Sequence, residues 1–121
     1  MNQPIRDPDL KQLIDDITVD TYGDAERASS FHTAFDDHVE LPTEAQIIGV
    51  TVTVHEFDIG GDGTTLTARC SRGTTEEWLS LVDLEFPADS PAAWVHAAYR
   101  YDLGMKPYPS AMPEDWKLNW A

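Results

Sequence analysis

The spacing of the apolar residues changes near residue 46, and this change restricts the fold more than any other feature. Before Pro42 the apolar residues recur every three or four positions, which is typical of one face of an α-helix. From Gln46 they alternate with polar residues, which is typical of a strand with one buried face. Helices followed by strands predict an α+β fold.

Two helices are expected before residue 42. The first should span about residues 8–18, with Asp7 as its cap and Pro8 in its first turn. Its apolar face consists of Leu10, Leu13, Ile14 and Ile17. The second should span about residues 24–38, because Pro42 prevents a continuation. Its apolar face consists of Ala28, Phe31, His32, Phe35 and Val39.

Three strands joined by short turns are expected over about residues 46–86. The first begins at Gln46, and the glycine-rich hairpin Asp58–Gly63 leads to the second. A turn at Arg72-Gly73 leads to the third, over Trp78–Phe86. Consecutive strands with short connections form an antiparallel meander, so we expect a small, strongly bent, barrel-like sheet. The helices should cover its apolar face.

A third helix is expected over about residues 91–103, with Ser90 as its cap and Gly104 at its end. From residue 104 to residue 121 the chain is rich in proline and is expected to be extended, held in place by Trp116 and Trp120. A chain of 121 residues has the length of one domain, so residues 1–121 are expected to fold together.

The charge of the chain excludes several partners. The sequence contains 22 acidic and 8 basic residues, which gives a formal net charge of -14. A surface this negative repels nucleic acid and anionic lipid, and it attracts cations and basic proteins. No apolar run is long enough to cross a bilayer, and the first nine residues contain no apolar stretch of a secretory signal. We therefore expect a cytoplasmic protein that binds neither nucleic acid nor membrane.

The acids at the end of the second predicted helix point to a cation. Asp36, Asp37 and Glu40 fall where the helix carries about half a negative charge, and an exposed carboxylate there is disfavoured by about 0.3–1 kcal/mol. A cation at this point could bind their carboxylates and the last backbone carbonyls, which lack partners within the helix. Calcium (Ca2+) prefers such a mixture of oxygen ligands, whereas magnesium usually retains water and binds beside a phosphate.

Two further groups of acids are candidate ligands. Asp20 and Glu26 flank the start of the same helix, although acids in a first turn also complement the positive helix end. Asp58 and Asp62 flank a Gly-Gly pair in the hairpin, although Asp-Gly is also a common turn sequence. Neither stretch has the ligand spacing of an EF-hand.

No motif for nucleophilic catalysis, phosphate binding or zinc coordination occurs in the sequence, so no enzymatic activity is expected. The alternative to a metal-binding protein is an acidic interaction module without metal. Such a module would mimic nucleic acid or inhibit a basic partner, and it would bind that partner in a salt-sensitive way.

The segments Ile17–Glu26 and Phe35–Pro42, followed by an alternating strand, resemble the CcbP family of small, acidic, non-EF-hand calcium-binding proteins. The resemblance covers about residues 10–86. It implies a cytosolic calcium buffer or sensor, linked in cyanobacteria to the control of heterocyst differentiation. It also implies metal ligands at Asp37 or Asp36, at Asp20 and at Glu26. The chain departs from this pattern at residues 41–44 and in its extended tail.

Overall fold

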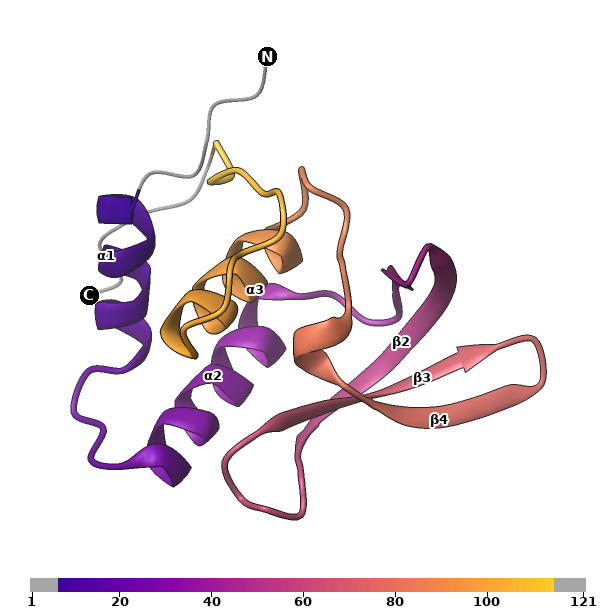
Figure 1. The fold of residues 1–121 in the computed structure, drawn as a ribbon, viewed down its shortest axis with the longest axis horizontal. Helices are drawn as coiled ribbons and strands as arrows, with labels where there is room; N and C mark the ends of the chain where they lie inside the picture. Colours follow the sequence, from indigo (N-terminus) through magenta and orange to yellow (C-terminus); the bar gives the residue numbers. More distant parts are fainter. Residues whose placement is uncertain (1–6, 115–121) are drawn as a thin grey trace.

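The computed structural model describes residues 7–114, and these form three α-helices beside a four-stranded antiparallel sheet, so the predicted α+β class is confirmed (Figure 1). The helices are α1 (Asp7–Ile17), α2 (Asp24–His38) and α3 (Pro91–Asp102). The strands are β1 (Thr43–Ile47), β2 (Val50–Ile59), β3 (Leu66–Arg72) and β4 (Thr75–Ser80), and a single 3-10 turn, η1, follows at Leu81–Asp83. The strands lie in sequence order.

The two predicted N-terminal helices are confirmed, with bounds within one residue of those expected. The four apolar residues predicted for α1 are all buried, and in α2 the predicted face is buried except for His32, which is half-buried. The cap of α3 is also as expected, because the Ala93 N–H donates to Ser90 Oγ at 3.2 Å and Pro91 follows the cap. Local signals alone therefore locate these helices.

The prediction of a single strand from Gln46 is wrong, because the chain forms a hairpin there. β1 and β2 are separated by a two-residue turn, in which Ile48 has φ 49° and Gly49 has φ 73°. Positive φ at both central positions is the requirement of a type I′ turn, which normally selects Asn-Gly. Isoleucine at the first position continues the apolar alternation and therefore conceals the turn in the sequence.

The expected third strand over Trp78–Phe86 is also wrong in extent. β4 ends at Ser80, and the chain makes one 3-10 turn that brings both Leu81 and Leu84 into the core. It then touches β1 through a single antiparallel bridge between Gln46 and Glu85. Because β1 and β4 do not pair, the sheet is open and the expected barrel-like closure is not formed.

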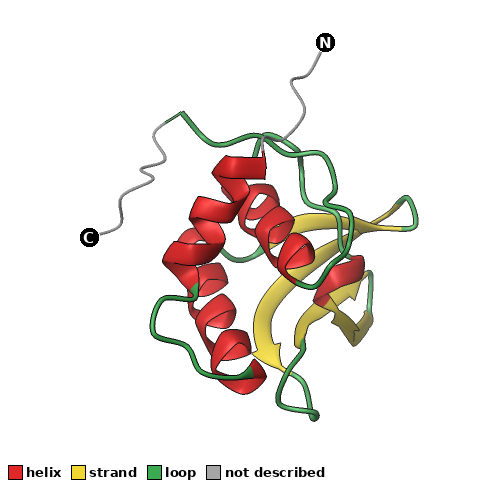
Figure 2. Cartoon of the chain, turned by 60° about the vertical axis from the view of Figure 1, so that its left-hand side comes forward, coloured by secondary structure: helices red, strands yellow, loops and turns green. Residues whose placement is uncertain are grey.

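Helix α3 occupies the centre of the fold. Its residues Ala92–Tyr99 are all buried. The other two helices pack against α3, and α2 also packs against β2 (Figure 2). The Tyr99 hydroxyl accepts a hydrogen bond of 3.0 Å from the Leu66 N–H, and this bond ties α3 to the start of β3.

Residues 103–114, after α3, form no helix or strand, and Arg100 is their anchor among the described residues. Arg100 Nε donates to the Lys106 carbonyl at 2.8 Å, and its guanidinium lies 4.1 Å from the centre of the Tyr108 ring. The same ring stacks on His96 with an interplanar angle of 14°. Trp116 and Trp120 lie outside the described residues.

The burial of His96 should make the free energy of unfolding depend on pH. Burial lowers the pKa of this imidazole to about 4, and its Nε2 lies 2.6 Å from the Leu81 carbonyl, which fixes a proton on that nitrogen. In the unfolded chain histidine takes up a second proton near pH 6.5, whereas the folded protein does so only near pH 4. The free energy of unfolding should therefore be highest above pH 6.5 and fall by about 3 kcal/mol between pH 6.5 and 4.

Urea unfolding at a series of pH values measures this effect, and His96→Gln should flatten the fall. A free energy of unfolding that stays constant from pH 7 to 5 in the wild-type protein would contradict the assignment.

Replacement of the exposed Ile48 should stabilise the protein. Its side chain is 97% exposed and its φ is positive, which is unfavourable for a β-branched residue. Ile48→Asn should raise the free energy of unfolding by about 1 kcal/mol, because asparagine tolerates the left-handed region and no buried apolar contact is lost. Thermal unfolding measures the change. Val50→Asn, at a less exposed strand position next to the turn, is the matched control and should destabilise the protein.

Candidate metal centre

The C-terminal end of α2 exposes the acids that the sequence singled out. The helix ends at His38, and the Val39 N–H closes it by donating to the Phe35 carbonyl at 3.0 Å. Asp36 and Asp37 lie in this last turn and Glu40 follows it, and all three side chains are exposed. The helix thus ends with carboxylates and its last backbone carbonyls in one place, as a cation site of this kind requires.

The basic side chains near these acids are histidines. Among residues 7–114, the one basic side chain within ion-pair distance of Asp36 is His32, with Nε2 3.3 Å from Asp36 Oδ2. The same nitrogen lies 3.0 Å from the Phe57 carbonyl, so it faces two acceptors and must carry a proton. His32 therefore acts as a hydrogen-bond donor that holds the end of α2 against β2.

Burial changes the pKa of His38 more than the neighbouring Asp37 does. Burial lowers the pKa of its imidazole, and the negative charge of Asp37 opposes this effect without cancelling it. Because the neutral imidazole is favoured, His38 does not offset the negative charge of the helix end near neutral pH. The carboxylates remain available to a metal cation.

The donors at this helix end fit calcium in kind, since carboxylate and peptide oxygens are the ligands it prefers. They are few, however. Within the described part of the chain, no three histidine, cysteine, aspartate or glutamate side chains are grouped so that they could hold a metal. An ion at the end of α2 would therefore need backbone carbonyl and water oxygens in addition to Asp36 and Asp37.

Asp20 and Glu26 lie at the opposite end of α2. Asp20 is exposed in the turn after α1 and has φ 61°. Glu26 Oε2 accepts a hydrogen bond of 2.9 Å from the Tyr22 N–H, so this carboxylate caps the start of the helix. Asp36 follows Glu26 by ten positions along the helix, or roughly 15 Å. The two groups of acids cannot share one ion.

The hairpin acids already have hydrogen-bond partners. Asp62 Oδ1 accepts from the backbone N–H groups of Thr64 and Thr65, each at 3.0 Å, and these bonds lower the pKa of its carboxyl group. Asp58 Oδ1 accepts from the Ile59 N–H at 2.8 Å. Asp62 therefore shapes the loop in its metal-free form, whatever else it binds.

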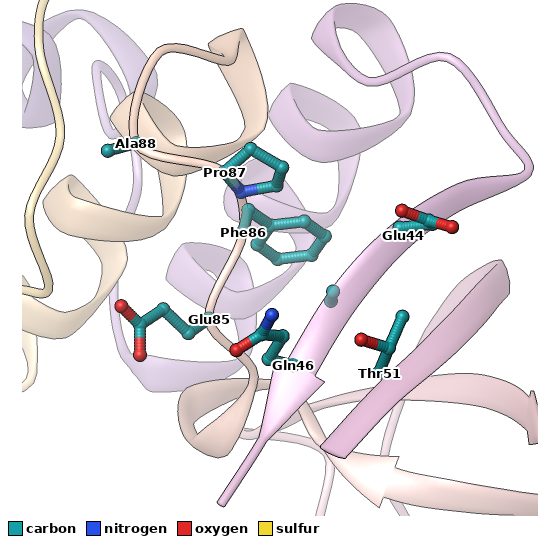
Figure 3. Close-up of a pocket in the computed structure, with 8 residues that line it drawn as sticks. Glu44, Gln46, Thr51, Glu85, Phe86, Pro87 and Ala88 are labelled. Carbon is teal, nitrogen blue, oxygen red and sulfur yellow. The ribbon is translucent and has the colours of Figure 1, made fainter. Parts of the chain in front are cut away.

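A cavity that the sequence did not predict lies beside β1. Its volume is about 250 Å³, and Glu44 and Glu85 lie on opposite sides of it (Figure 3). The other lining residues are Ala45, Gln46, Thr51, Phe86, Pro87 and Ala88. The sequence signal that could have found it is Pro87, which cannot donate a ladder hydrogen bond and so ends the pairing with β1.

Two solved structures share this fold. The crystal structure of CcbP from Anabaena matches with a TM-score of 0.68 and 23% sequence identity, over 88% of this chain and 99% of CcbP. A calcium-binding protein in its calcium-binding form matches with a TM-score of 0.66 and 19% identity, over 84% of this chain and 95% of that protein. The resemblance read from the sequence is thus matched by a common fold.

Comparison with family models gives no match, and neither does comparison with curated proteins. Among the described residues, no helix is long and apolar enough to cross a membrane.

Because Asp62 accepts hydrogen bonds from the hairpin backbone, its replacement should loosen the loop. Asp62→Ala should leave the N–H groups of Thr64 and Thr65 without their acceptor, so their amide hydrogens should exchange faster with solvent in the absence of metal. Hydrogen-exchange NMR measures both rates. Asp58→Ala is the matched control in the same hairpin and should leave these two rates unchanged.

Proposed function

We propose that this chain binds calcium at the C-terminal end of α2, with Asp36 and Asp37 as the principal ligands and without enzymatic activity. The observation that carries the proposal is the common fold with a protein solved in its calcium-binding form. The exposed acids at the negative end of a helix support it, because a divalent cation would remove an unfavourable interaction there.

Two weaker sites complete the proposal. Asp20 and Glu26 would hold a second ion near the start of α2, where Glu26 retains a second carboxylate oxygen besides the one bound to Tyr22. Asp58 and Asp62 would form a separate site in the hairpin. An ion there would have to replace hydrogen bonds of the loop, so this site should have the lowest affinity.

The biological role that follows is a cytoplasmic calcium buffer or sensor. Binding removes repulsion among neighbouring acids and therefore favours the folded state. In a sensor this change would be read by a downstream protein, as in a pathway that controls cell differentiation. The strongly negative surface also favours a basic protein partner over nucleic acid or membrane.

Calcium titration of the full chain tests the proposal. Calcium should raise the midpoint of thermal unfolding, since a ligand at 100 times its Kd stabilises the folded state by about 2.7 kcal/mol. Asp37→Asn should lower the calcium affinity by about tenfold in calorimetry. Asp36→Asn should lower it as well, because the proposal makes both carboxylates principal ligands.

Asp15→Asn is the matched control, because Asp15 is an exposed acid on α1 and the substitution changes the net charge equally. It should leave the calcium affinity unchanged. An unfolding midpoint that does not respond to millimolar calcium would refute the proposal, and an equal effect of all three variants would show only nonspecific screening of charge.

A further inference from the structure

The two edge strands of the sheet, β1 and β4, differ in whether another segment of the chain bonds their outer backbone groups. At the β1 edge, the Gln46 N–H donates to the Glu85 carbonyl at 2.8 Å, and the Glu85 N–H donates to the Gln46 carbonyl at 2.7 Å. Pro87 lies two residues further on and has no N–H to donate. This edge is therefore closed to further strands by a bridge and a proline.

The β4 edge has no such protection in the described part of the chain. The two-residue turn after Arg72 makes Arg72 and Thr75 a hydrogen-bonded pair, and the pairs then alternate along the strand. Glu76, Trp78 and Ser80 consequently direct their N–H and C=O groups away from β3. No backbone hydrogen bond from another described segment reaches these three residues.

The side chains of β4 are as accessible as its backbone. All residues of the strand except Leu79 are exposed, because β4 extends beyond the helices (Figure 1). Trp78, in the middle of the open edge, is 48% exposed. A large aromatic side chain in this position offers apolar area and a ring face for a cation.

The charges on β4 favour a basic partner. Glu76 Oε2 is bound by Arg69 Nη1 at 3.1 Å, but no lysine or arginine among the described residues lies within ion-pair distance of Glu77. The net charge of -14 opposes the approach of a second copy of this chain. Acidic side chains on an edge strand thus reject self-association while they attract an oppositely charged strand.

We propose that β4 binds an extended, basic segment of another protein by strand addition, with Trp78 as the apolar anchor. Alternate residues of that segment would pair with the backbone groups of Glu76, Trp78 and Ser80. Lysine or arginine side chains on the segment would lie near Glu77 or over the Trp78 ring. This inference does not depend on calcium binding.

The probes are three synthetic octapeptides: alternating lysine and valine, the same sequence with a fully N-methylated backbone, and alternating glutamate and valine. Titration of the full chain, followed by NMR, should shift the amide signals of Glu76, Trp78 and Ser80 with the lysine peptide and not with the glutamate peptide. The N-methylated peptide should bind at least about tenfold more weakly, because its backbone cannot donate hydrogen bonds.

Three variants test separately the backbone hydrogen bonds, the Trp78 anchor and the charge of β4. Ser80→Pro removes one outward N–H, and the φ of -65° at Ser80 already suits proline, so the fold should be retained. Trp78→Thr removes the anchor and keeps a residue that favours strands. Glu77→Lys reverses a charge on β4, and Glu44→Lys makes the same change of charge on the opposite edge strand. The first three should each weaken binding about tenfold, and Glu44→Lys should have no comparable effect.

The proposal is overturned if the lysine peptide at millimolar concentration leaves the β4 amides unshifted, or if Glu44→Lys weakens binding as much as Glu77→Lys. It is also overturned if sedimentation shows a dimer of the full chain that Ser80→Pro dissociates, because a second copy would then be the occupant. Retained folding of each variant is checked by its NMR spectrum.

Discussion

The fold depends on the burial of residues Ala92–Tyr99 of α3. A helical stretch that is buried on every side must be enclosed by other elements. Here α1, α2 and η1 pack against it, the start of β3 bonds Tyr99, and Tyr108 stacks on His96. Its small residues, such as Ala97 and Ala98, allow close approach, and its aromatic residues fill the space between helices and sheet. The remaining elements are positioned by their contact with this helix, including the end of α2 that carries the proposed calcium site.

Within residues 7–114, three arginines connect separate elements of the fold. Arg27 forms a two-pronged ion pair with Asp102, which connects the start of α2 to the end of α3. Arg69 binds Glu56 and Glu76 across three strands, and Arg100 fastens the C-terminal segment. The ion pairs of Arg27 and Arg69 engage Asp102, Glu56 and Glu76, and none of these three acids is a proposed calcium ligand.

The candidate site was predictable only in part. The sequence identified the acids at the end of α2, since their position follows from the helix bounds alone. It also placed Asp20 and Glu26 at the start of that helix, but it did not show that His32 lies beside Asp36 while it hydrogen-bonds the Phe57 carbonyl. These contacts join α2 to β2, and their pairing depends on packing between elements that no local pattern encodes. The open edge of β4 escaped prediction because its strand was placed too late in the chain.

By itself, the sequence determined the helices, the α+β class and the excess of negative charge. Caps, turn residues and apolar spacing act within a few residues of one another, so they can be read without a structure. The tertiary structure decided the hairpin at Ile48, the 3-10 turn after β4, the central place of α3 and the open sheet. These features depend on which surfaces bury one another. An unfavourable local conformation, such as that of Ile48, is accepted when the strands on either side of the turn gain partners and a core.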